Sequence, residues 1–168
     1  MYYHGRGEGR QFTRAAISSD GIQFEGREED LGRPYFRVIK HDDFYYAMTM
    51  PGYLLRSRDG LTNFEAGPQF FTPDMRHSAL LIEGNHLYVF FTKRGDMPER
   101  IMLSTIELTD DWNQWTASEP VEVLRPEMDF EGANLPIEIS RGGYIDEQVH
   151  QLRDPAIYQE NGKTYRLY

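Results

Sequence analysis

Arg33-Pro34-Tyr35, Arg76-His77-Ser78 and Arg153-Asp154-Pro155 each open one copy of a repeated segment in this 168-residue chain. In every copy an apolar stretch follows the arginine, a polar stretch comes next, and a tyrosine stands 12 residues after the arginine: Tyr45, Tyr88 and Tyr165. Two short apolar runs on either side of a polar turn predict a β-hairpin. Recurrence at intervals of tens of residues predicts an array of equivalent modules.

A second repeat alternates with the first. The run Ser18-Ser19-Asp20-Gly21-Ile22-Gln23-Phe24 recurs as Ser57-Arg58-Asp59-Gly60-Leu61-Thr62-Asn63-Phe64, and loosely over residues 109–115. The Asp-Gly pair suits a tight turn with positive φ, and the aromatic residue returns to a core. A strand-like run precedes each copy, so a full unit reads as hairpin, strand, turn and outer strand. Four antiparallel strands in one unit are typical of a β-propeller blade.

The spacing of the arginines sets the organisation of the chain. They lie 43 and then 77 residues apart, and the longer interval predicts one blade plus an inter-blade insertion, which we place at residues 123–151. We expect a single all-β domain over residues 1–168: an incomplete β-propeller with the tail of one blade, two complete blades and the opening hairpin of another, roughly three blades in all. Open sheet edges of this kind predict self-association.

The composition limits the classes of function. The formal net charge of −9 argues against nonspecific nucleic-acid binding, which needs clustered lysine and arginine. The longest apolar runs are too short to cross a bilayer, so we expect no membrane partner. There is no cysteine, and the five histidines are scattered, so neither a metal nor another cofactor is predicted. The cellular location stays undetermined.

The innermost strands of a propeller line a central funnel, and equivalent positions of successive blades converge there. Arg33, Arg76 and Arg153 occupy such positions, together with the residues that follow them, Pro34, His77 and Asp154. Convergence of polar groups from distant parts of a chain is how a pocket for a small ligand is assembled.

Two segments resemble a known group of proteins. The run Leu152-Arg153-Asp154-Pro155-Ala156-Ile157-Tyr158 resembles the Arg-Asp-Pro blade opening of the five-bladed propeller glycosidases, which include glycoside hydrolase families 43 and 32. Residues 15–25 are similar to a segment common in these propellers and in the mannoside phosphorylases. The resemblance implies a five-bladed fold and a glycoside hydrolase that acts on oligosaccharide or polysaccharide, such as plant or algal fragments.

In that group a general base, a general acid and an aspartate that tunes the acid act together at the funnel. The resemblance assigns the tuning and hydroxyl-binding role to Asp154, with Arg153 keeping it ionised. Alternatively, Arg153 and Asp154 form a pair that only fixes the start of the blade. His77 stands where the pattern would place a carboxylate. It is either a general acid near neutral pH or a structural histidine bonded to a backbone carbonyl.

The predicted insertion mixes acids, an asparagine and an aromatic, and a loop of this length can cover a funnel. Any one of these polar residues can also be an ordinary solvated loop residue. We predict three catalytic residues: Asp154, His77 and Glu138. The predicted substrate-binding residues are Arg153, Arg76, Arg33, Asn134, Glu131 and His150.

Two classes of function remain open at this point. The first is the glycosidase, and the second is a noncatalytic propeller that binds glycans or proteins. They differ in whether three carboxylates, or two carboxylates and a histidine, face the channel at separations of roughly 5 to 9.5 Å.

Overall fold

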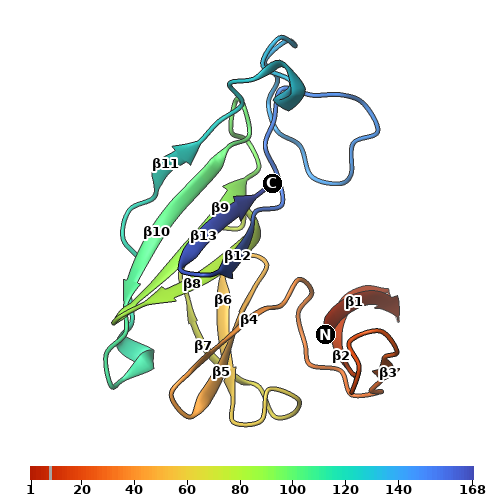
Figure 1. Cartoon of the computed structure of the whole chain (residues 1–168), viewed down its shortest axis with the longest axis vertical. Helices are drawn as coiled ribbons and strands as arrows, with labels where there is room; N and C mark the ends of the chain where they lie inside the picture. Colours follow the sequence, from red (N-terminus) through yellow and green to blue (C-terminus); the bar gives the residue numbers. More distant parts are fainter. Residues whose placement is uncertain (8) are drawn as a thin grey trace.

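A computed structural model describes residues 1–7 and 9–168 of the chain, and its regular structure is almost entirely β (Figure 1). The strands form four antiparallel sheets in chain order. They are β1 (Tyr2–Gly7), β2 (Arg10–Ile17) and β3 (Glu25–Gly26); β4 (Arg37–His41), β5 (Phe44–Thr49), β6 (Tyr53–Ser57) and β7 (Glu65–Gln69); β8 (Met75–Glu83), β9 (His86–Lys93), β10 (Ile101–Glu107) and β11 (Val121–Leu124); and β12 (Ala156–Glu160) and β13 (Lys163–Leu167). Two 3-10 helices, η1 (Trp112–Gln114) and η2 (Asp129–Glu131), complete the described elements.

The three repeated segments form the hairpins β4–β5, β8–β9 and β12–β13, as predicted. Each hairpin has a two-residue turn that contains at least one residue with positive φ: Asp42 (49°), Gly84 (56°), and Asn161 and Gly162 (52° and 73°). Such turns match the right-handed twist of the flanking strands. Local turn chemistry therefore explains why the repeat could be read from the sequence.

The Asp-Gly repeat forms the turn that leads to the last strand of a sheet, after β2 in the first sheet and after β6 in the second. The Oδ1 atom of Asp59 accepts hydrogen bonds from the backbone N–H groups of Leu61 and Thr62, both at 2.8 Å. Asp20 accepts two equivalent bonds, and Gly21 and Gly60 adopt φ values of 73° and 71°. The loose third copy differs, because there Asp111 caps the 3-10 helix η1 instead of forming an Asp-Gly turn.

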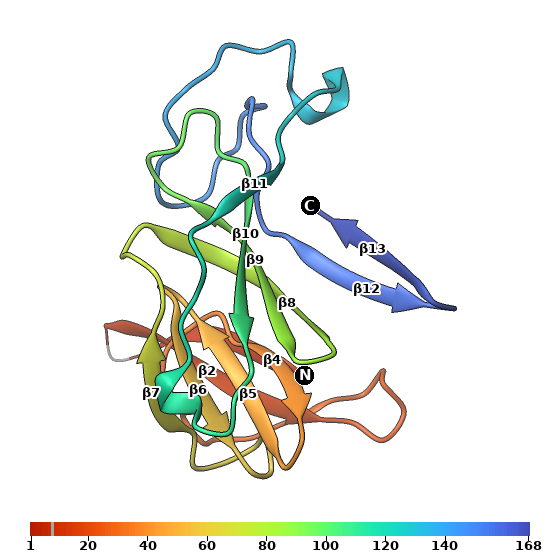
Figure 2. The ribbon, with the colours of Figure 1, turned by 90° about the vertical axis from the view of Figure 1, so that its left-hand side faces the viewer.

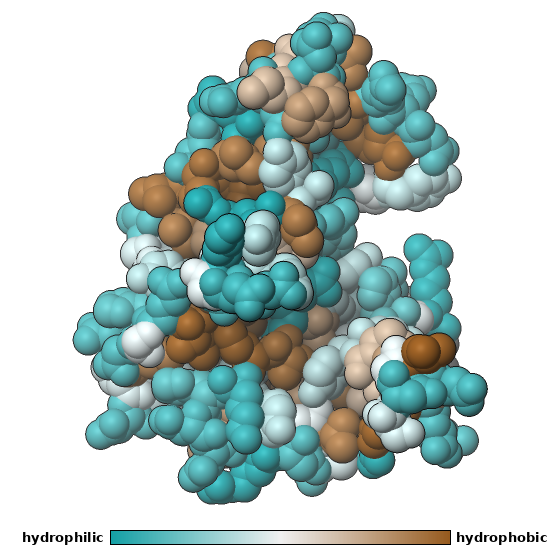
Figure 3. All heavy atoms as spheres, viewed as in Figure 1, coloured by the Kyte–Doolittle hydropathy of each residue, from teal (hydrophilic) through white to brown (hydrophobic). Residues whose placement is uncertain are grey.

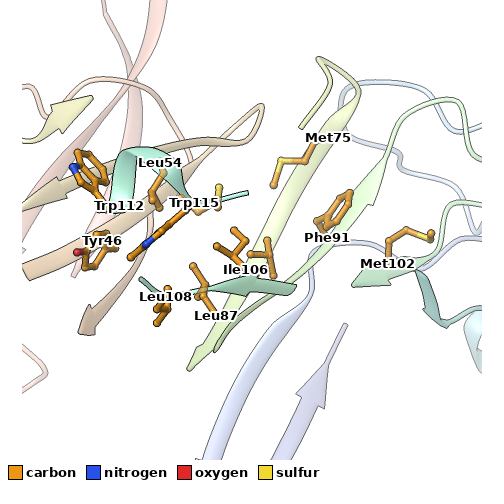
Figure 4. Close-up of a cluster of buried hydrophobic side chains, with 12 residues drawn as sticks. Tyr46, Leu54, Met75, Leu87, Phe91, Met102, Ile106, Leu108, Trp112 and Trp115 are labelled. Atoms are coloured by element: carbon orange, nitrogen blue, oxygen red, sulfur yellow. The ribbon is translucent and has the colours of Figure 1, made fainter. Parts of the chain in front are cut away.

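Successive sheets pack face against face. The cluster in Figure 4 fills the space between the β4–β7 and β8–β11 sheets, and it includes Tyr46, Leu54, Phe91, Ile106 and Trp115. A second cluster joins the β8–β11 sheet to Leu152 and β12, and a third joins the first two sheets. The first strands of the last three sheets also touch in order, β4 with β8 and β8 with β12 (Figure 2). This is a propeller-like arrangement of sheets.

Within the described residues, β1 pairs only with β2, and β13 only with β12. The predicted self-association through such edges stays a prediction.

β11 includes Val123 and Leu124 from the range predicted as an insertion, and between β11 and β12 the described chain forms only η2. No helix among the described residues is long and apolar enough to cross a membrane.

Gly67 of β7 packs against the indole ring of Trp112, which belongs to the 3-10 helix η1. A Cβ atom at this position would overlap the six-membered part of the Trp112 indole ring. We expect Gly67→Ala to lower the free energy of unfolding by about 1–3 kcal/mol, because overpacking forces a buried ring to move. Urea denaturation measures the change. Gly5→Ala is the matched control, since a Cβ there meets no atom within 4 Å. Equal stability of the two variants would contradict this packing.

Candidate functional site

The structure brings His77 and Asp154 into contact, although they lie far apart in the sequence. His77 belongs to β8, and Asp154 stands just before β12, the neighbouring first strand. The Nδ1 atom of His77 meets the Oδ1 atom of Asp154. Asp154 adopts a φ of 51°, a left-handed conformation that aspartate and asparagine tolerate better than most residues. The contact of these two side chains is the centre of the candidate site.

Both residues line a pocket of about 640 Å³. Its walls come from β1 and β2, from the approach to β4, from β8 and the end of β9, and from the loop before β12. Figure 3 shows a hollow on this side of the molecule, between the lobe of the long loop that joins β11 to β12 (residues 125–155) and that of the β1–β2–β3 sheet. The lining residues include Arg6, Gln11, Tyr35, Arg76, His77, Arg94, Tyr144, Glu147, Arg153 and Asp154.

Glu99 lies behind this pocket and is fully buried. Its Oε2 atom accepts hydrogen bonds from Arg76 at 3.1 Å and from the Ser140 hydroxyl, and it lies 3.0 Å from Nε of Arg153. Its Oε1 atom has no hydrogen-bond partner among the described residues. One carboxylate thus joins the starts of two neighbouring sheets to the long loop. Sequence reasoning missed Glu99, which belongs to no motif.

Arg76 and Arg153 also hold the loop directly. Each donates hydrogen bonds to the backbone carbonyls of Arg141 and Gly143, at 3.1 to 3.4 Å. The side chain of Arg76 is 7% exposed and that of Arg153 is 15% exposed, so their charges lie mostly away from water. These two predicted substrate-binding arginines therefore shape the pocket wall, and a direct role in binding substrate stays a prediction.

Three rings pack in a row, tilted by 45° and 38° to one another, and the last two, Tyr35 and His77, line the pocket. The ring centroids of His4 and Tyr35 lie 4.1 Å apart, and those of Tyr35 and His77 lie 4.5 Å apart. Tyr35 has a φ of 65°, which is uncommon for a bulky residue and sets the direction in which its side chain leaves the chain. Tyr35 therefore packs against the His77 imidazole, while the Asp154 carboxylate meets the edge of that ring at Nδ1.

Burial of the imidazole, and then the positive charges of Arg76, Arg37, His4 and Arg153, lower the pKa of His77 to about 4. The Asp154 carboxylate acts in the opposite direction. Its side chain is 57% exposed, however, so water screens its charge and the lowering prevails. With this pKa His77 is neutral at pH 7, and its Nδ1 atom faces the Asp154 carboxylate.

This lowered pKa makes the stability of the protein depend on pH. Because the unfolded chain binds a proton at His77 near pH 6.5 and the folded chain only near pH 4, the stability contribution is present above pH 6.5. We expect it to fall as the pH drops from 6.5 to 4, by at most about 2–3 kcal/mol. Urea denaturation across this range measures the slope, and His77→Asn should flatten it. An unchanged slope in the variant would show that other groups cause it.

The remaining predicted residues lie outside this pocket. Arg33 stacks on the ring of Tyr53, with its guanidinium carbon 3.8 Å from the ring centroid. Asn134 and Glu138 are exposed in the long loop. Nδ1 of His150 lies 3.0 Å from the carbonyl oxygen of Leu135. Glu131 accepts backbone hydrogen bonds at the start of η2 and lines a second pocket of about 560 Å³. Roles for these residues in catalysis or binding stay predictions.

Glu147 is the second carboxylate of the pocket, and the sequence did not single it out. It is exposed, and it lies in the same loop as Glu138. Its presence means that two carboxylates and one histidine line the same space. Among the described residues, no group of three histidine, aspartate or glutamate side chains is arranged to hold a metal ion.

Comparisons with known proteins place this site in context. No family model matches the chain. The chain is 37% identical, over 188 residues, to "Uncharacterized protein R118" of Acanthamoeba polyphaga mimivirus. That match covers 100% of this chain and 53% of the relative, so the chain spans about half the length of the curated protein it matches.

A solved structure, "Crystal structure of a thermostable family-43 glycoside hydrolase", matches this fold with a TM-score of 0.59. The match covers 98% of this chain and 61% of the other, at 15% sequence identity. At that identity the likeness concerns the fold alone. The chain therefore has an all-β, propeller-like fold similar to that of a family-43 glycoside hydrolase.

Proposed function

We propose that this chain provides the acid–base site of a glycoside hydrolase that acts on oligosaccharide or polysaccharide. The observation that carries the proposal is the meeting of His77 and Asp154 with Glu147 in one pocket. Hydrolysis of a glycosidic bond needs a proton donor, a base and a group that holds the ring hydroxyls. The likeness to a family-43 glycoside hydrolase and the Arg153-Asp154-Pro155 opening support the same class.

The electrostatics suggest a role for each residue. A neutral His77 that donates Nδ1–H to Asp154 keeps Nε2 as an acceptor, which favours a general base over the general acid considered from the sequence. Nε2 takes a proton from water as the water oxygen attacks the anomeric carbon. Glu147 donates its proton to the leaving oxygen as the glycosidic bond breaks. Asp154 orients the imidazole and accepts hydrogen bonds from ring hydroxyls.

The exposed position of Glu147 suits the acid role only if bound sugar removes water from around it. A carboxyl group that acts as a general acid must keep its proton near the working pH, and desolvation raises a carboxyl pKa. The ring of Tyr144 lines the same pocket and is 86% exposed, so a sugar can stack on it and displace water from the pocket.

The test is hydrolysis of a panel of plant and algal polysaccharides by the purified protein, measured as the release of reducing sugar. We expect release from at least one substrate and none from denatured protein. Binding without hydrolysis, measured by calorimetry on the same panel, would favour the noncatalytic glycan-binding propeller. If the protein neither binds nor hydrolyses any member of the panel, the proposal of a carbohydrate ligand is refuted.

A further inference from the structure

The pocket carries a charge of opposite sign to the chain as a whole. The formal net charge of the chain is −9. Four arginines nevertheless line this pocket: Arg6, Arg76, Arg94 and Arg153. They face two carboxylates, those of Asp154 and Glu147. The buried Glu99 behind the wall balances only one of the two arginines that it contacts. The lining itself therefore holds four guanidinium groups and two carboxylates, while Glu99 and Asp74 lie beside it and pair with Arg76, Arg153 and Arg94.

Arg6 and Arg94 are the arginines of this set that a ligand can reach. Arg6 is exposed on β1, directly opposite Gln11 of β2, and Gln11 lines the same pocket. The side chain of Arg94 is 42% exposed. It donates one hydrogen bond to the Pro73 carbonyl at 2.6 Å and lies 3.6 Å from Oδ1 of Asp74, which leaves further N–H groups for a ligand.

The environment of His77 is a second sign of positive potential. After burial, the guanidinium charges of Arg76, Arg37 and Arg153 are among the causes that lower its pKa. A neutral sugar gains nothing from such a field. A bound anion does, because guanidinium groups recognise carboxylate and sulfate through charge-assisted, paired hydrogen bonds.

We propose that this pocket selects an acidic saccharide, whose ring carries a carboxylate or sulfate that Arg6 and Arg94 bind while its hydroxyls meet Asp154. This inference rests on the proposed function, since it names the substrate class for the same site. Gln11 beside Arg6 adds an uncharged donor, which suits an oxygen-rich group. The exposed ring of Tyr144 offers an apolar surface for the face of the sugar.

The test compares charged oligosaccharides with uncharged partners of the same backbone. The probes are uronic-acid oligosaccharides and their carboxyl-reduced forms, and sulfated galactan oligosaccharides and their desulfated forms. Isothermal titration calorimetry at low ionic strength should show one charged probe binding at least about tenfold more tightly than its uncharged partner. Which pair shows the preference identifies the acidic group. The preference should shrink as salt is added, because the two arginines are exposed.

Variants locate the preference within the pocket. Arg6→Gln and Arg94→Gln should each reduce the preference for the charged probe several-fold and leave binding of the uncharged partner unchanged. Arg125→Gln is the matched control, an equal charge change at an exposed arginine paired with Glu122 outside the pocket. Equal or tighter binding of the uncharged forms would overturn the inference and keep the proposed function. Binding of no probe would also overturn the inference, and the hydrolysis panel then decides the proposed function separately.

Discussion

His77→Ala, Asp154→Asn and Glu147→Gln should each lower the turnover of the protein on its substrate by ~10²–10⁴-fold, because loss of a general acid or base typically costs that much. The melting temperature should change little. Asp154→Asn is the most informative of the three variants, because asparagine tolerates the φ of 51° and the substitution removes little more than the negative charge. Turnover and melting temperature are measured on the same preparations.

The control for these variants is Glu119→Gln, which removes an exposed carboxylate between η1 and β11. It should keep wild-type turnover. Glu138→Gln separates the two loop carboxylates: a large loss there, with near-normal turnover in Glu147→Gln, would give the acid role to Glu138. Near-normal turnover in both His77→Ala and Asp154→Asn would end the catalytic assignment. Lost stability, with activity falling only in proportion to folded protein, would make the pair structural.

Glu99→Gln should lower the free energy of unfolding by about 3–5 kcal/mol, because removing one partner of a buried ion pair leaves a buried charge uncompensated. Here the charges of two arginines, Arg76 and Arg153, lose their shared partner. Since small domains are stable by only about 5–15 kcal/mol, the loss should be evident in the melting temperature. Urea denaturation gives the free energy.

Glu122→Gln is the control for Glu99→Gln. Glu122 pairs with Arg100 and Arg125 near the surface, and such pairs contribute about 0–1 kcal/mol. The two variants remove the same charge, so their difference reports the burial of Glu99. Equal losses in the two variants would contradict the view that Glu99 fixes the pocket wall.

The sequence predicted the parts of the fold that depend on local chemistry. The repeated hairpins depend on two-residue turns such as Asn161-Gly162. Asparagine and glycine are residues that readily adopt the positive φ values of such turns. The Asp-Gly turns at Asp20 and Asp59 are equally local. The loose copy near Trp112 differs from these two turns. It has no Asp-Gly pair, and the chain forms a capped 3-10 helix there.

The candidate site was only partly visible in the sequence. His77 and Asp154 follow the repeated arginines, so the register of the repeat placed them at neighbouring first strands. Glu99 and Glu147 belong to no repeated segment. Their positions depend on the path of the long loop, which Arg76 and Arg153 fix through carbonyls distant in the sequence. A loop held by tertiary contacts has no periodicity that would reveal which of its side chains enter a pocket.

The most direct test of the central claim is the position of a bound sugar. A crystal structure of the protein with an oligosaccharide identified by the hydrolysis or calorimetry panel provides it. The account predicts a sugar ring in the pocket between β1, β8 and β12, with a hydroxyl within hydrogen-bond distance of Asp154 and the anomeric carbon near His77. A sugar bound away from both residues, such as in the second pocket beside Glu131, would contradict the account.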